Sequence, residues 1–174
     1  MFVFVALAIP ATVLALPLGH PPQATSATIN GMPEATSFAG VPEIGALYAT
    51  AHATRHECTA SVVHSAGRNT LITAAHCVVG SGAGMAFAPG LAGTVMPSGR
   101  WIVTAAYLES KWVTRRDPHA DVAFLTVAPR TINGVVEEVE DVTGGYRLGP
   151  TATRGQRVTI TGYPAGSNND PIVC

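Results

Sequence analysis

The chain has 174 residues, which suits one domain, or one domain and the beginning of another. Ten lysines and arginines against eleven aspartates and glutamates leave it almost neutral, which argues against nucleic acid or an anionic membrane as a partner. Charged residues make up only 12% of the chain, whereas there are 18 glycines and 13 prolines. This composition, rich also in Val, Thr and Ala, predicts short strands joined by many turns, and hence an all-β sandwich or barrel.

Residues 1–16 predict a signal peptide. The run is apolar except for Thr12, is too short to span a bilayer comfortably, and is followed by Pro17. Residues 13–15 supply small side chains where a signal peptidase would cut. The positive charges that usually precede such a core are absent, since the first basic residue is Arg55. We expect a secreted protein without a membrane anchor.

Residues 17–37 predict a flexible leader or propeptide, because Pro, Thr, Ser and Ala dominate there without a period of two or 3.6. We expect the folded part to begin at Phe38. Several short apolar or alternating segments, separated by Gly and Pro, then predict strands that suit a small closed barrel. They are residues 58–63, 68–73, 85–88, 101–107 and 122–127, with Trp101, Val103, Ala105 and Tyr107 expected on one face.

The following stretch, residues 129–150, is acidic and contains glycines, which predicts a solvated connection. Alternation of polar and apolar residues resumes over residues 156–164. We therefore expect one further strand there, within residues 151–174.

A histidine stands out in residues 71–77, Leu-Ile-Thr-Ala-Ala-His-Cys. An apolar strand end runs into a turn of small residues that presents His76 beside Cys77. A lone histidine is more often a surface or satisfied core residue. Here the alanines leave space before the ring and a covalent anchor follows, so the imidazole suits a general base, whose unperturbed pKa lies near neutral pH.

Three blocks in the same order resemble the trypsin-like, chymotrypsin-fold serine peptidases, especially their secreted bacterial members. They are C-T-A-S-V-V at residues 58–63, T-A-A-H-C around His76, and D-V-A-F-L from Asp121. The resemblance covers roughly residues 38–174. It implies a Greek-key barrel fold, with a complete first barrel over residues 38–128, an inter-barrel connection over 129–150 and a second barrel only begun over 151–174.

The resemblance also implies site residues. His76 matches the general base, and Asp121 the carboxylate that orients it, placed where a strand begins. A strand cap or turn residue is the alternative for Asp121. We read His119, which lies just before it, as a loop residue.

The nucleophile is absent from this chain. The family's serine sits in a loop resembling G-D-S-G-G, and no serine here has that setting. Ser81 and Ser167 lie beside glycines and are interpreted as turn residues. We therefore expect that the chain holds two members of a triad and that this fragment alone is inactive.

Cysteine usage predicts one disulfide. Cys58 and Cys77 lie 19 residues apart around a strand-turn-strand pattern, and with an export signal we expect them to be bridged. Two free buried thiols in a cytosolic protein are the alternative. Cys174 is left over, as a free thiol or as half of a bridge to sequence outside this chain.

The resulting hypothesis is a secreted, monomeric trypsin-like serine endopeptidase acting on protein or peptide substrates, without metal or cofactor, of which this is the N-terminal part. A non-catalytic homologue, whose first barrel is a binding or structural module, is the main alternative. A third interpretation is a metal site of His52 and His56 with Cys58 or His64. We expect the segment containing that histidine pair to be an exposed hairpin loop instead.

Overall fold

The computed structural model describes residues 34–150, 153–165 and 169–174. The expected signal peptide and most of the expected leader lie outside these ranges. Within them no helix is long and apolar enough to cross a membrane.

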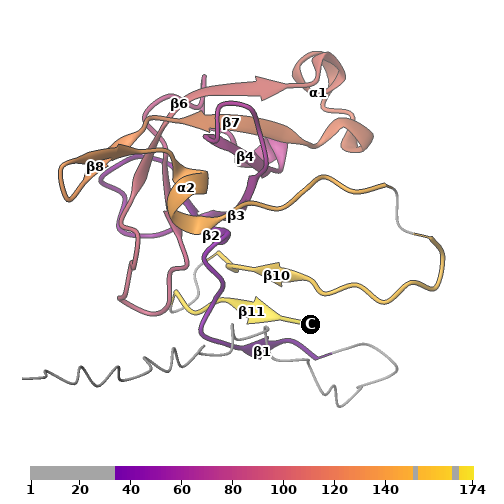
Figure 1. The fold of residues 1–174 in the computed structure, drawn as a ribbon. Coiled ribbons are helices and arrows are strands. Elements are labelled where there is room, and N and C mark those ends of the chain that lie inside the picture. The colour runs from indigo at the N-terminus through magenta and orange to yellow at the C-terminus, as the bar shows by residue number, and fades with distance from the viewer. Residues whose placement is uncertain (1–33, 151–152, 166–168) are drawn as a thin grey trace, which may run out of the picture.

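Six antiparallel strands close into a barrel, which confirms the all-β prediction (Figure 1). The order around the barrel is β2-β3-β4-β7-β6-β5, so β7 returns to lie between β4 and β6. The sequence pattern located five of these strands to within about two residues, whereas it gave no bounds for β2. Their bounds are β2 (Ile44–Tyr48), β3 (Cys58–Val63), β4 (Thr70–Thr73), β5 (Ala86–Pro89), β6 (Trp101–Leu108) and β7 (Ala123–Val127).

Inward-facing apolar side chains fill the barrel. Strand β7 shows the alternation most clearly, with Ala123, Leu125 and Val127 buried and the residues between them partly exposed. The largest side chains of this core, including Trp101 and Phe87, are fully buried. Burial of this apolar surface is what stabilises the scaffold that carries the site.

Strand β6 departs from the predicted single face. Trp101 and Val103 are buried, but Tyr107 is 59% exposed. The pairing of β6 with β7 shifts register between Val103 and Ala105, and such a bulge moves the later side chains to the opposite face. Ala106 consequently packs against the core in place of its neighbours.

The stretch after β7 is more ordered than a solvated connection. It forms a hairpin of β8 (Arg130–Ile132) and β9 (Val135–Glu137), followed by a short helix, α2 (Val139–Thr143). Val139 is fully buried in the barrel core and Thr143 is 4% exposed. The predicted solvated connection is therefore wrong at α2, because its acidic side chains cap or flank a helix whose inner face is apolar.

A second, smaller sheet lies beside the barrel, in the order β1-β11-β10 (Figure 1). Its strands are β1 (Thr36–Ser37), β10 (Thr161–Gly162) and β11 (Ile172–Val173). The predicted strand over residues 156–164 is thus shortened to β10, which pairs only with β11. The end of the expected leader supplies β1, whose residues pair with those of β11.

Candidate active site

His76 is presented on a short 3-10 turn, η1 (Ala75–Cys77), that follows β4. Ala74 is still extended, with φ −78° and ψ 145°, and Ala75 turns inward against an apolar cluster that includes Trp112. Because Ala75 is buried, its neighbour points outward. The His76 side chain is 61% exposed, so the imidazole is open to a reacting group.

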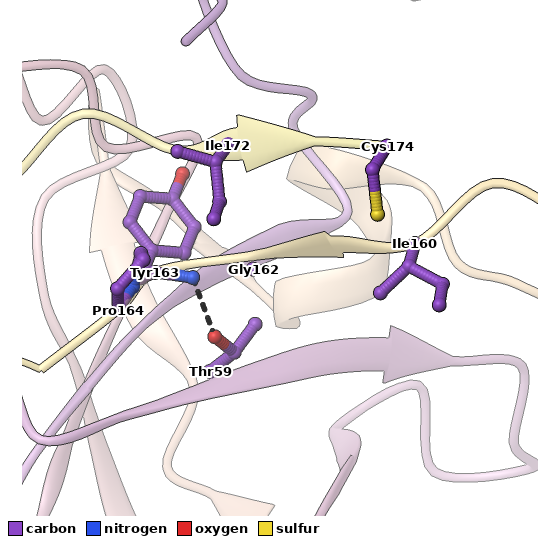
Figure 2. Close-up of a pocket in the computed structure, with 7 residues that line it drawn as sticks. All are labelled: Thr59, Ile160, Gly162, Tyr163, Pro164, Ile172 and Cys174. Carbon is purple, nitrogen blue, oxygen red and sulfur yellow. Dashed lines mark hydrogen bonds between the residues drawn. The ribbon is translucent and has the colours of Figure 1, made fainter. Parts of the chain in front are cut away.

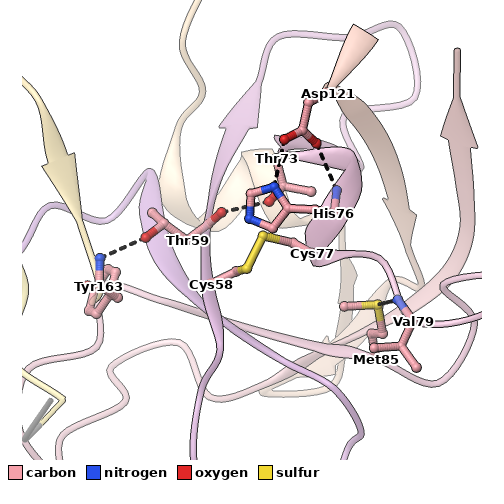
Figure 3. The surroundings of a disulfide bond; sticks show 9 residues. All are labelled: Cys58, Thr59, Thr73, His76, Cys77, Val79, Met85, Asp121 and Tyr163. Carbon is pink, nitrogen blue, oxygen red and sulfur yellow. Dashed lines mark hydrogen bonds and ion pairs between the residues drawn. A yellow bond between two sulfur atoms is a disulfide. The ribbon is translucent and has the colours of Figure 1, made fainter. Parts of the chain in front are cut away.

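Asp121 reaches the same place from a second 3-10 turn, η2 (Pro118–Ala120). The Asp117 carboxylate accepts a hydrogen bond from the His119 backbone N–H at 3.0 Å and begins this turn. Asp121 Oδ1 then accepts from the His76 backbone N–H at 2.8 Å, and Oδ2 lies 2.7 Å from the ring Nδ1 (Figure 3). One carboxylate therefore fixes both the backbone and the ring of His76.

This geometry determines the charge and the tautomer of the pair. The hydrogen bond from the His76 ring is the main cause that holds the pKa of the Asp121 carboxyl below its ordinary value, and the His76 backbone N–H acts in the same direction. An ionised carboxylate only accepts hydrogen bonds, so Nδ1 carries a proton. Nε2 of the neutral ring is then free to accept one, which is what a general base requires.

The predicted disulfide between Cys58 and Cys77 is confirmed, with a Cα–Cα distance of 6.1 Å. It joins the first residue of β3 to the last residue of η1 and so anchors the turn that carries His76. Cys174 is the remaining cysteine and is partly exposed at the end of the second sheet.

The same bridge explains why three potential metal ligands lie close together. The ligand atoms of Cys58, His76 and Cys77 lie within 4.8 Å of one another. The two sulfurs are bonded to each other and are not thiolates, so they do not form a metal site of the usual kind.

The proposed histidine cluster does not form among the described residues. The His56 ring lies between the rings of Tyr48 and Tyr163, with centroid distances of 6.1 and 5.9 Å. His64 Nδ1 instead pairs with Glu140 Oε1 at 2.5 Å. The interpretation of His52, His56 and His64 as metal ligands is therefore wrong.

The expectation that this segment is an exposed loop is wrong at His56, because His56 is only 2% exposed. Among the residues that the structure describes, neither of its ring nitrogens has a hydrogen-bond partner. Burial lowers the pKa of His56 below its ordinary value of 6.5, with Glu57 opposing this change and Arg55 adding to it. A buried neutral imidazole at this position had no signal in the sequence.

No serine hydroxyl is hydrogen-bonded to His76 within the described ranges. Ser81 is exposed in the turn after η1, and its carbonyl accepts from the Ala106 backbone N–H at 3.2 Å. Ser167 lies outside the described residues. The structure thus brings His76 and Asp121 together, as the sequence predicts, and the part of the chain that it describes places no serine hydroxyl in a hydrogen bond with His76.

Two threonines next to the site were not predicted to have a role. The Thr73 hydroxyl donates to the Thr59 carbonyl oxygen at 2.8 Å, and the Thr59 hydroxyl accepts from the Tyr163 backbone N–H at 2.7 Å (Figure 3). The second contact joins residues 104 positions apart. Local alternation places Thr59 on a strand but cannot indicate so distant a partner.

A closed antiparallel barrel with a histidine and an aspartate paired in this way is typical of a trypsin-like peptidase domain. The family model of the trypsin-like peptidase domain matches residues 58–174, which is more than half of the chain. The chain therefore belongs to this family, with the chymotrypsin fold. No curated protein matched the chain in a sequence search.

Solved structures agree with this assignment. The protease Anisep from Arthrobacter nicotinovorans is 28% identical with a TM-score of 0.66, over 81% of this chain and 66% of that one. A thermostable serine protease, AL20, from an extremophilic microorganism is 26% identical with a TM-score of 0.61, over 76% of this chain and 64% of that one. A Glu endopeptidase, 19% identical with a TM-score of 0.53, covers 75% of this chain and 58% of that one and shares the fold. The chain thus spans less than two thirds of these proteins.

Proposed function

We propose that this chain is part of a secreted serine endopeptidase in which His76 is the general base and Asp121 orients it. The observation that carries the proposal is the double hydrogen bond from Asp121 to the backbone and ring of His76, at 2.8 and 2.7 Å. Membership of the trypsin-like peptidase family supports the same roles.

The chemistry follows from the tautomer. Nε2 of His76 takes the proton of a serine hydroxyl as the oxygen attacks the peptide carbonyl, and later returns it to the leaving amine. Asp121 remains ionised throughout and stabilises the imidazolium that forms. Donors for the developing oxyanion complete the site.

The serine and the oxyanion donors are proposed to come from sequence that follows Cys174. Two observations support this: the described residues place no serine hydroxyl against His76, and the serine protease AL20 is longer than the matched part of this chain. The chain by itself would then fold the base and the carboxylate without turning over substrate. Protein or peptide chains are the proposed substrates, and no step needs a metal or cofactor.

The test is an intact mass of the native secreted product with and without a fluorophosphonate, which labels activated serines. One label on a product heavier than the 17.9 kDa of this chain, lost in His76→Ala, is the expected result. A folded product that carries no label would contradict the peptidase proposal and favour a non-catalytic homologue whose barrel serves as a binding or structural module. Labelling of the 17.9 kDa chain itself would contradict the proposed origin of the serine.

A further inference from the structure

Thr59 connects the candidate active site to the second sheet. Its carbonyl oxygen accepts from the hydroxyl of Thr73, the last residue of β4, at 2.8 Å. Thr73 lies three residues before His76. The Thr59 hydroxyl oxygen accepts from the backbone N–H of Tyr163, which directly follows β10, at 2.7 Å (Figure 3). A single residue therefore contacts both the strand that leads to His76 and the second sheet.

On the side of β3 that faces β4, these contacts lie beyond the strand ladder, whereas on the other side Thr59 pairs with Ala46 of β2. The pairing of β3 with β4 runs from Ser61 and Ile72 to Val63 and Thr70, so Thr59 lies beyond it. Strand β10 pairs with β11 and with no barrel strand. At this point the side-chain hydroxyls of threonines make the connections that backbone groups make within a ladder.

The junction is partly closed to water, since Thr59 and its hydrogen bond to Tyr163 are partly buried. Tyr163 is 3% exposed, and its hydroxyl donates to the Leu91 carbonyl at 2.8 Å, which fixes the far end of its ring. Thr73 is 8% exposed. If the Thr59 hydroxyl were removed, the Tyr163 N–H would lose its acceptor at a partly buried position, and a donor left unpaired there costs free energy.

An apolar pocket of about 220 Å³ adjoins this bond (Figure 2). Thr59 and Tyr163 form part of its wall, and residues in or next to the second sheet form the rest, namely Ile160, Gly162, Pro164, Ile172 and Cys174. Figure 2 shows the bond from the Tyr163 N–H to the Thr59 hydroxyl at the edge of this pocket. It joins the residue after β10 to β3, while the bond from the Tyr163 hydroxyl to Leu91 holds the other end of the ring.

We propose that Thr59 is a positioning residue, whose hydroxyl sets the spacing between the second sheet and β3, and whose carbonyl is bonded to Thr73 at the end of the strand that leads to His76. This inference rests on the proposed function, in which the serine follows the second sheet in sequence. The reacting atoms must then meet Nε2 at about 3 Å, and a misplacement of about 1 Å can cost about 100-fold in rate. Thr59 itself does not contact the reacting atoms in this proposal.

The first experiment measures the bond directly in the 174-residue chain. Thr59→Val removes the acceptor but keeps the shape, whereas Thr59→Ser keeps the acceptor. We expect the Tyr163 amide to exchange its hydrogen about 2- to 10-fold faster in Thr59→Val, as loss of one hydrogen bond implies, and at the original rate in Thr59→Ser. Equal exchange in all three proteins would overturn the proposal.

The second experiment measures positioning in the complete secreted enzyme, through the rate constant of fluorophosphonate labelling. We expect a loss of about 10- to 100-fold in Thr59→Val and recovery in Thr59→Ser. Val139→Ala is the matched control, because it weakens the barrel core elsewhere and should label at the original rate.

The outcomes separate the two proposals. Faster Tyr163 exchange with unchanged labelling in Thr59→Val would overturn the positioning role and leave Thr59 as a structural contact. If the unaltered enzyme is not labelled at all, the proposed function fails and the positioning role of Thr59 in catalysis fails with it. The exchange rates would still show whether Thr59 holds the second sheet.

Discussion

Removal of the Cys58–Cys77 bridge is the most informative perturbation of the scaffold. The bridge closes a loop with a sequence separation of 19 residues, and in the chain-entropy treatment a loop of this size stabilises the folded state by about 3 kcal/mol. For a domain of this size, about 3 kcal/mol corresponds to a fall in melting temperature of about 6 to 12 °C. The double substitution Cys58→Ser, Cys77→Ser should therefore lower the melting temperature by about 6 to 12 °C.

Thermal unfolding followed by circular dichroism measures this change. Cys174→Ser is the matched control, because Cys174 is not bridged in the structure and its loss should leave the melting temperature unchanged. A reductant should lower the melting temperature of the unaltered chain and of the control, but not that of the double variant. A double variant as stable as the control would refute the argument that the bridge stabilises the folded state.

Three further predictions concern the site and its support. Asp121→Asn should lower turnover of the complete enzyme by about 10⁴-fold, because the ring would lose its orienting charge, and a steady-state assay that found near-normal turnover would exclude the proposed role. Burial lowers the pKa of His56 below 6.5, so its contribution to stability should be complete above pH 6.5 and fall as the pH drops from there through the folded-state pKa. His56→Phe should remove this part of an acid-unfolding profile. An unchanged profile would count against a neutral buried ring. Val139→Ala should cost about 2 kcal/mol in urea unfolding, whereas Val142→Ala, on the exposed side of the same helix, should cost less than about 0.5 kcal/mol; equal losses would contradict the burial of Val139.

The features that the sequence predicts are those that depend on local pattern. The barrel strands have short alternating or apolar runs, as in β7, and each has turn residues at its ends. The pairing of His76 with Asp121 was predicted because short motifs around both residues match one family. The cysteine spacing and the predicted export signal were enough to predict the bridge between Cys58 and Cys77.

The features that the sequence did not predict depend on contacts between distant residues. The bulge in β6 is a property of its pairing with β7, so the composition of β6 alone did not reveal that Tyr107 faces outward. The acidic composition around α2 conceals Val139, which fills a gap in a core built by other strands. Thr59 and Tyr163 meet only once the second sheet has packed against the barrel.

The protonation state of the His76 ring tests the central claim most directly. Nitrogen NMR of the 174-residue chain, with histidine labelled, reports which ring nitrogen carries the proton at neutral pH. We predict that Nδ1 of His76 is protonated and hydrogen-bonded, that Nε2 is bare, and that this preference is lost in Asp121→Asn. A ring that exchanges freely between both tautomers in the unaltered chain would contradict the assignment of His76 as a base held by Asp121.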